Sequence, residues 1–198
     1  MLPYSQSSQG FTLVELMIVV TMLSIVLTIG APSFSGFIQE GRVKSGSRAV
    51  AVAIQTARLK AINSNRRAYI DFAPGSLTPA DSFYTIWLDI DNDLSFDAGE
   101  ADSSGLAMPE VKSGIPGFAL AKGVAFKSTG VTSGPDGLAI ASDGVDFGGN
   151  DAVSFNGRGE ASSAGVVYLT GENGSIYSVT VTSLGAVRSL RWEDNTWK

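Results

Sequence analysis

Five acidic side chains crowd one twelve-residue stretch near the middle of the chain, Asp-Ile-Asp-Asn-Asp-Leu-Ser-Phe-Asp-Ala-Gly-Glu. Its acids stand at positions 1, 3, 5, 9 and 12 of the stretch and are Asp89, Asp91, Asp93, Asp97 and Glu100. These are ligand positions of a common calcium-binding loop. Several carboxylate oxygens are needed to replace the water around calcium, and clustered carboxylates repel one another without a cation. The chemistry that this acidic loop (residues 89–100) could perform is therefore cation binding.

The same residues also fit a metal-free acidic turn. Position 6 of a calcium loop is normally Gly, which allows a sharp turn, and here it is Leu94. The flanking helices of such a loop are also missing, because Trp87 lies in a predicted strand. Asp and Asn side chains in a turn can instead accept hydrogen bonds from their own backbone. Calcium and an acidic hairpin turn both remain open, and bound calcium would brace the loop rather than activate water.

Composition excludes several functional classes. The chain has 198 residues, a net charge of −5, and neither Cys nor His. A Cys/His zinc site and a Ser-His-Asp or Cys-His nucleophilic site are excluded by residue type alone. The acidic balance also argues against a broad nucleic-acid-binding surface. We predict no catalytic residue, so the protein is expected not to be an enzyme.

A second charged residue stands out near the N-terminus. Residues 11–29 are almost wholly apolar and long enough to cross a membrane as a helix, but Glu15 interrupts them. A lone acid inside a membrane costs about 2.5 to 3.5 kcal/mol on insertion scales. The span contains no basic residue, so the neutralising cation must come from outside it. Cleavage between Gly10 and Phe11 would create such a cation, a new α-ammonium group.

The segment Gly10-Phe-Thr-Leu-Val-Glu15, followed by its apolar run, resembles the class III leader junction of type IV pilins and type II secretion pseudopilins. The resemblance implies that a prepilin peptidase cuts after Gly10 and N-methylates Phe11. It also implies that Glu15 guides assembly into a helical filament and that Pro32 bends the helix. A secretory signal peptide is disfavoured because the run is long and contains an acid.

The resemblance divides the chain into a cleaved leader (1–10), a transmembrane helix (11–31), a periplasmic half of the helix (32–65) and a β-rich domain (66–198). The leader has no basic residue, unlike the usual family leader, whereas three basic residues follow the span: Arg42, Lys44 and Arg48. By the positive-inside rule, that distribution argues for the opposite orientation. We follow the junction motif and expect a single pass through the inner membrane, with the C-terminal domain in the periplasm or on the filament.

Periodicity predicts the elements that position these residues. Glycines between 30 and 46, together with Pro32, weaken the helix, so a bend or local melting is expected there. Apolar residues then recur at helical spacing as Val50, Ile54, Ala57 and Ala61. The segment Asn63-Ser-Asn65 predicts the helix end. The expected fold is α+β, with the second half of a long N-terminal helix packed on an antiparallel, β-rich domain.

Strands are predicted over 68–72, 83–89, 124–127, 152–155, 165–170, 176–181 and 186–192. The stretch 128–150 is expected to be loops with one or two brief strands. The segment Glu172-Asn-Gly174 predicts a type I′ hairpin turn. Sequence order resembles that of H-type minor pseudopilins (the GspH/FimT group), in the helix end 57–65, in 153–159 and in 179–188.

That resemblance implies a structural minor pilin or pseudopilin of a type II secretion pseudopilus or type IV pilus. Its expected partners are prepilin peptidase, other pilins or pseudopilins in a helical filament, and the inner-membrane assembly platform. The alternative is a DNA- or substrate-binding minor pilin at a pilus tip, which would use basic residues such as Arg188 and Arg191. The segment Gly185-Ala-Val-Arg188 lacks the first arginine of the DNA-binding motif found in some relatives, so nucleic acid is not an expected partner.

Overall fold

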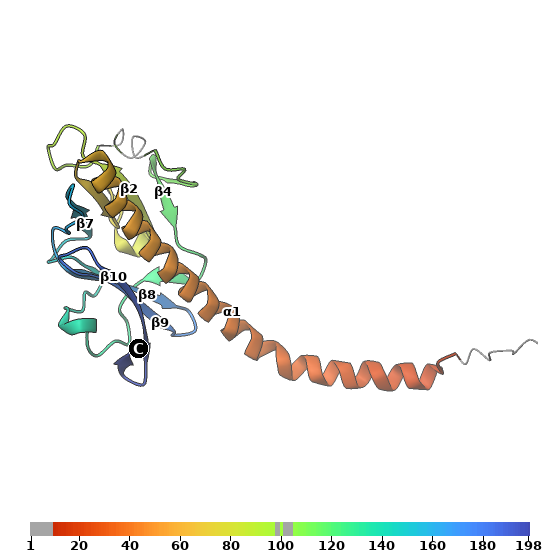
Figure 1. The fold of residues 1–198 in the computed structure, drawn as a ribbon. Coiled ribbons are helices and arrows are strands. Elements are labelled where there is room, and N and C mark those ends of the chain that lie inside the picture. Colours follow the sequence, from red (N-terminus) through yellow and green to blue (C-terminus); the bar gives the residue numbers. More distant parts are fainter. Residues whose placement is uncertain (1–9, 98–99, 101–104) are drawn as a thin grey trace, which may run out of the picture. The chain divides into compact units, whose positions relative to one another are not determined.

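The computed structural model describes residues 10–97, 100 and 105–198, and within these it leaves the side chains of 29–34 undescribed. Most of the predicted leader therefore lies outside the described residues. The chain divides into two compact units, Met1–Ile38 and Gln39–Lys198, which are considered separately. One long helix, α1 (Leu13–Ser64), precedes a set of β-strands, which confirms the predicted α+β class (Figure 1).

The part of α1 in the second unit packs on the strands through one narrow face (Figure 1). The predicted face residues Val50, Ile54, Ala57 and Ala61 are all fully buried. Small alanines on this face let the helix approach the sheets closely. The helix is continuous through residues 30–46, so the predicted local melting is absent, while the bend predicted at Pro32 falls among the undescribed side chains and stays a prediction.

The helix ends where its sequence predicted. Asn65 has a left-handed backbone with φ of 50°, and the amide of Arg66 donates to the carbonyl of Ala61 at 3.3 Å. This arrangement satisfies a carbonyl that the last helical turn would otherwise leave unpaired. Asn serves here because it tolerates the left-handed conformation better than most residues.

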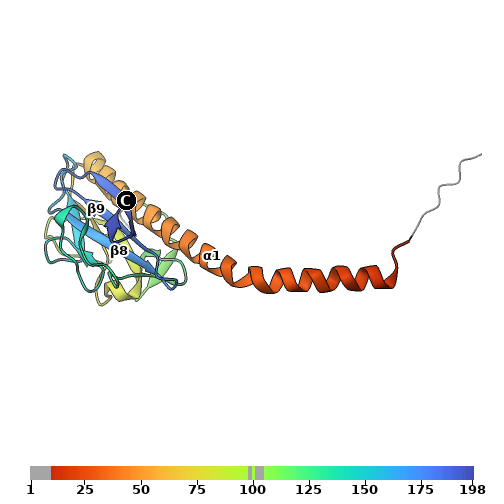
Figure 2. The same ribbon diagram turned by 90° about the horizontal axis from the view of Figure 1, so that it is seen from below.

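The strands form two antiparallel sheets. The first has the order β3-β4-β2-β1-β7 and contains β1 (Ala68–Asp71), β2 (Phe83–Leu88), β3 (Glu110–Lys112), β4 (Ile115–Ala119) and β7 (Ala152–Phe155). The second has the order β11-β10-β9-β8-β5, with β6 paired to β8. Its strands are β5 (Val124–Phe126), β6 (Val145–Asp146), β8 (Gly165–Gly171), β9 (Ile176–Val181), β10 (Val187–Glu193) and β11 (Thr196–Trp197). Figure 2 shows β8 and β9 side by side.

The core lies where the helix meets both sheets. Ile70 of β1 pairs with Ile86 on one side and with Val153 on the other, and all three are buried. In the second sheet, Val167 pairs with Val179, and both side chains are fully buried. These residues belong to the same apolar cluster as the helix face. The sheets and the second half of α1 therefore share one hydrophobic core.

Three strands and one turn differ from expectation. The seven predicted strands are present, but β3, β4 and β11 were not predicted. In β4, Pro116 and Gly117 are residues that normally interrupt strands. The predicted hairpin between β8 and β9 is present, whereas its type I′ turn is wrong: of its residues, only Gly174 has positive φ. The side chain of Asn173 accepts hydrogen bonds from Ser175, and the amide of Gly174 donates to the carbonyl of Gly171. A type I turn followed by a left-handed glycine explains this geometry.

Candidate functional site

The predicted processing junction leads directly into the start of α1. Thr12 precedes the helix, and its carbonyl accepts the first helical hydrogen bond, from Leu16 at 3.2 Å. The amide of Thr12 donates to Oε2 of Glu15 at 2.9 Å, and its hydroxyl donates to the same oxygen at 3.0 Å. In return, the amide of Glu15 donates to Oγ1 of Thr12 at 3.2 Å. This reciprocal pair is a capping box.

Sequence reasoning missed this local role of Glu15. The pattern Thr-x-x-Glu before an apolar run is a recognised start signal for a helix, and it is present at residues 12–15. Both members lie on the C-terminal side of the Gly10–Phe11 bond, so cleavage there leaves the box intact. Glu15 is therefore held at the helix start by its own chain, in addition to any role toward another subunit.

The large apolar side chains between Phe11 and Leu27 face outward. They range from 50% exposed at Ile18 to 88% exposed at Phe11. Phe11 lies outside the helix and beside the predicted cleavage bond, where a peptidase could reach it. No helix among the residues that the structure describes has both the length and the apolar character needed to cross a membrane.

The acidic loop begins directly after β2. Asp89 is only 3% exposed, and neither of its carboxylate oxygens has a hydrogen-bond partner. Asp91 and Asp93 are exposed, and one carboxylate oxygen from each of the three residues lies within 4.8 Å of the others. The structure thus brings together three of the five predicted ligands.

The other two predicted ligands, Asp97 and Glu100, lie outside this group of three. Glu100 is buried, and its Oε1 accepts from the amide of Ile90 at 2.8 Å. Its Oε2 accepts from the amide of Asp97 at 3.3 Å, while its own amide donates to the carbonyl of Asp97 at 2.9 Å. Glu100 therefore links the two ends of the acidic loop through backbone groups.

Comparison with known families decides the kind of protein. Residues 5–31 match the model of the prokaryotic N-terminal methylation motif, and residues 47–185 match that of the type II transport protein GspH. The second match covers more than half of the chain. The chain belongs to the GspH family. Together, the two matches identify a minor pseudopilin of the type II secretion and type IV pilus systems, whose family members are structural subunits.

No curated protein matches the pseudopilin sequence. Among solved structures, it is similar to the minor pseudopilin EpsH from the type 2 secretion system of Vibrio cholerae. The two are 12% identical, with a TM-score of 0.45, and the match covers 76% of this chain and 97% of EpsH. Family membership implies filament partners of the pilin type, processing by a prepilin peptidase and an N-terminus anchored at the inner membrane.

Two glycine-containing segments of the pseudopilin meet at one helical arginine. Nε of Arg58 donates to the carbonyl of Gly159 at 2.8 Å, and its NH2 group donates to the carbonyl of Leu184 at 3.4 Å. A Cβ at Gly185 would lie 2.3 Å from the Gly159 carbonyl oxygen, so a side chain does not fit there. Arg58 thereby ties α1 to the turns before β8 and before β10.

The arginines that would serve the DNA-binding alternative are paired with acids. NH2 of Arg188 lies 2.9 and 2.8 Å from the two carboxylate oxygens of Asp136. NH2 of Arg191 lies 2.9 Å from Oε1 of Glu40. Neutralised arginines on an acidic protein provide little attraction for phosphate groups. This geometry gives the tip-binding alternative no support.

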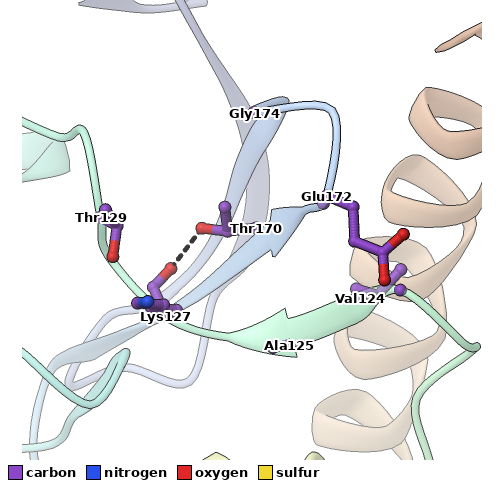
Figure 3. Close-up of a pocket in the computed structure, with 9 residues that line it drawn as sticks. Val124, Ala125, Lys127, Thr129, Thr170, Glu172 and Gly174 are labelled. Carbon is purple, nitrogen blue, oxygen red and sulfur yellow. Dashed lines mark hydrogen bonds between the residues drawn. The ribbon is translucent and has the colours of Figure 1, made fainter.

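A pocket with a volume of about 480 Å³ lies beside β5 and the β8–β9 hairpin (Figure 3). Its polar side chains include Lys127, Thr170 and Glu172. The hydroxyl of Thr170 donates to the backbone carbonyl of Lys127 at 2.6 Å, so it is already used within the fold. Figure 3 shows Lys127 and Glu172 at separate ends of the pocket rather than directed at a common point. We assign no ligand to it.

Proposed function

We propose that prepilin peptidase cuts this pseudopilin between Gly10 and Phe11 and N-methylates Phe11, and that the mature chain enters a helical filament as a minor subunit. Glu15 then pairs with the Phe11 amine of a neighbouring subunit. The match of residues 5–31 to the methylation motif supports the processing step. The exposed junction, which lies outside α1, is consistent with cleavage at this bond.

The geometry of Glu15 suits a role between subunits. Both hydrogen bonds from Thr12 end on Oε2. A carboxylate has about four lone-pair positions over its two oxygens, so it can cap its own helix and also accept a neighbour's ammonium group. Pairing removes the cost, about 2.5 to 3.5 kcal/mol, of keeping an isolated acid in lipid. Assembly is therefore favoured over leaving the free subunit in the membrane.

The proposal places residues 11–31 in the inner membrane as a single pass and the unit Gln39–Lys198 in the periplasm or on the filament surface. The outward-facing apolar side chains between Phe11 and Leu27 support it, since such a surface needs lipid or neighbouring helices around it. The membrane assembly platform would then take up the subunit from this position. The observation that carries the proposal is the acid Glu15 within the almost wholly apolar, outward-facing stretch between Phe11 and Leu27.

The test separates the charge of Glu15 from its capping role. Glu15→Gln removes the charge but keeps a side chain that can complete a capping box, whereas Glu15→Ala removes both. We expect both variants to be processed normally and both to be incorporated poorly into filaments, measured by affinity pull-down of assembled subunits. Wild-type incorporation of Glu15→Gln would overturn the proposed pairing.

A further inference from the structure

We propose that the segment Asp89–Asp93 of the acidic loop is a calcium site to which Asp89, Asp91 and Asp93 each contribute a carboxylate oxygen. This inference is independent of processing at Gly10. It concerns only the globular unit, and no family match assigns a metal to it.

Asp89 is buried, and its carboxylate needs a cation as its partner. Asp89 is only 3% exposed to solvent. Both of its carboxylate oxygens are buried without a hydrogen-bond partner. A buried charge without a partner is far more costly than a buried neutral group. The backbone of Asp89 is satisfied by Arg67, whose carbonyl accepts from the Asp89 amide at 3.0 Å. The carboxylate alone is left unpaired.

No side chain that the structure describes supplies the missing positive charge. Within the described part of the chain, no lysine or arginine forms an ion pair with Asp89, Asp91 or Asp93. The nearby Arg66 donates through NH1 to the carbonyl of Ile90, so that contact is made with the loop backbone. A soluble cation can therefore provide what the protein does not.

The spacing of the three oxygens fits a single calcium ion. They lie within 4.8 Å of one another. Oxygen ligands lie about 2.3 to 2.6 Å from calcium, so two ligands of one ion are separated by at most about 5 Å. Three like charges this close repel one another strongly unless a cation lies between them.

The loop backbone holds two of the ligands in place. Oδ1 of Asp91 accepts from the amide of Asp93 at 3.3 Å, and Oδ1 of Asp93 accepts from the amide of Ser95 at 2.7 Å. These bonds are the ones expected of a metal-free acidic turn, and they account for Asp91 and Asp93. They do not account for Asp89. The turn and the metal site therefore coexist, with Asp89 as the residue that distinguishes them.

Leu94 no longer argues against a calcium loop. Its backbone φ is 65°, which is the left-handed conformation that glycine normally supplies at this position. The loop then returns to the sheet through Phe96, whose ring meets Trp87 edge-on at 5.7 Å between centroids. The backbone at this position therefore adopts the left-handed conformation without a glycine.

The donor set selects the ion. The chain has neither Cys nor His, so the nitrogen and sulfur ligands that zinc or copper prefer are absent. Three carboxylates with two exposed members leave room for water, which suits the variable coordination of calcium. Magnesium demands near-ideal octahedral geometry and shorter bonds, which an irregular loop provides less well.

The test uses the full-length protein in detergent micelles, with thermal unfolding and calorimetric titration as readouts. Calcium chloride at about 1 mM should raise the melting temperature above that in EDTA, because extracellular calcium modules bind with constants near that range. Asp89→Asn and Asp93→Asn should weaken calcium affinity by about 100-fold. The matched control is Glu110→Gln, which removes an exposed acid at the start of β3 and should respond to calcium as wild type does.

Asp89→Asn should also change the melting temperature in opposite directions in EDTA and in calcium. In EDTA it should melt at or above the wild-type temperature, because an amide is less costly to bury than an unpaired carboxylate. In calcium it should melt below wild type. Three results would overturn the site: no calcium response in wild type, an equal response to magnesium chloride, or an Asp89→Asn protein less stable than wild type in EDTA.

Discussion

Thr12 and Glu15 accept hydrogen bonds from each other's backbone amides at the start of α1. The amide of Thr12 donates to the Glu15 carboxylate at 2.9 Å, and the amide of Glu15 donates to the Thr12 hydroxyl at 3.2 Å. The acid that interrupts the apolar segment is thus part of the helix start. Since both residues follow the proposed cleavage bond, processing there would leave this arrangement intact in the mature subunit.

Thr12→Ala is the complement of Glu15→Gln, because it removes the capping hydroxyl and keeps the charge. We expect the first turn of α1 to be weakened by about 1 kcal/mol, the usual cost of losing such a cap. Filament incorporation should stay near the wild-type level in the same pull-down assay. If Thr12→Ala were excluded from filaments as strongly as Glu15→Gln, helix capping rather than charge would explain the requirement for Glu15.

Arg58→Ala should destabilise the globular unit by about 1.5 to 3 kcal/mol, since a charged donor loses the carbonyls of Gly159 and Leu184. Urea unfolding of the full-length protein measures the change. Arg48→Ala is the matched control, because Arg48 is an exposed arginine on the same helix. Its effect should stay within about 0.5 kcal/mol. Equal losses in the two variants would show that Arg58 does not tie the helix to these turns.

Two glycines should respond to alanine with opposite signs. A Cβ at Gly41 of α1 has no atom within 4 Å, so Gly41→Ala should stabilise the helix by about 0.5 to 1 kcal/mol. A Cβ at Gly117 of β4 would lie 2.5 Å from the carbonyl oxygen of Tyr84, so Gly117→Ala should cost about 1 to 3 kcal/mol. Thermal unfolding of the two variants tests both signs. A stable Gly117→Ala protein would contradict the close β2–β4 contact.

Asp71 should make the fold less stable as pH rises. Burial raises its pKa to about 6, the nearby Asp151 adds to this, and a hydrogen bond from the amide of Ala73 opposes it. Because the folded state holds this proton more tightly than the unfolded state, the favourable contribution is complete below about pH 4 and is lost as pH rises through about 6. The loss amounts to about 2 to 3 kcal/mol.

Asp71→Asn keeps an acceptor for the Ala73 amide and removes the titration. Its free energy of unfolding should therefore exceed that of wild type at pH 7 and approach it at pH 4, as measured by urea unfolding across this range. A wild-type and variant difference that does not change with pH would show that Asp71 is not the titrating group.

The predictable parts of the fold were those governed by local sequence. The stripe from Val50 to Ala61 and the stop at Asn65 depend on spacing and on one residue's conformational tolerance, and both are seen. The strand β4 was missed because its pairing with β2 and β3 outweighs the local signals of Pro116 and Gly117. Tertiary pairing routinely overrides such propensities.

In the candidate sites too, local sequence predicts local features but not contacts between distant residues. The acids of the loop could be identified by their spacing, but their sequence has no signal for the burial of Asp89, whose amide donates to the carbonyl of Arg67 at the other end of the β1–β2 segment. The hydrogen bond from Arg58 to the carbonyl of Gly159 joins residues 101 positions apart, so it has no local sequence signal. The capping box at Thr12 and Glu15 does have a local sequence signal, Thr-x-x-Glu before an apolar run. The charge of Glu15 inside that run can be explained by intersubunit pairing as well as by capping, so the charge alone does not indicate the cap.

The central claim is that the filament subunit begins at Phe11, with a new amine available to a neighbour's Glu15. Mass spectrometry of the N-terminal peptide, taken from protein expressed with its prepilin peptidase, tests this most directly. The account predicts a peptide that starts at Phe11 and carries one N-methyl group. A mature chain that still starts at Met1 would contradict it.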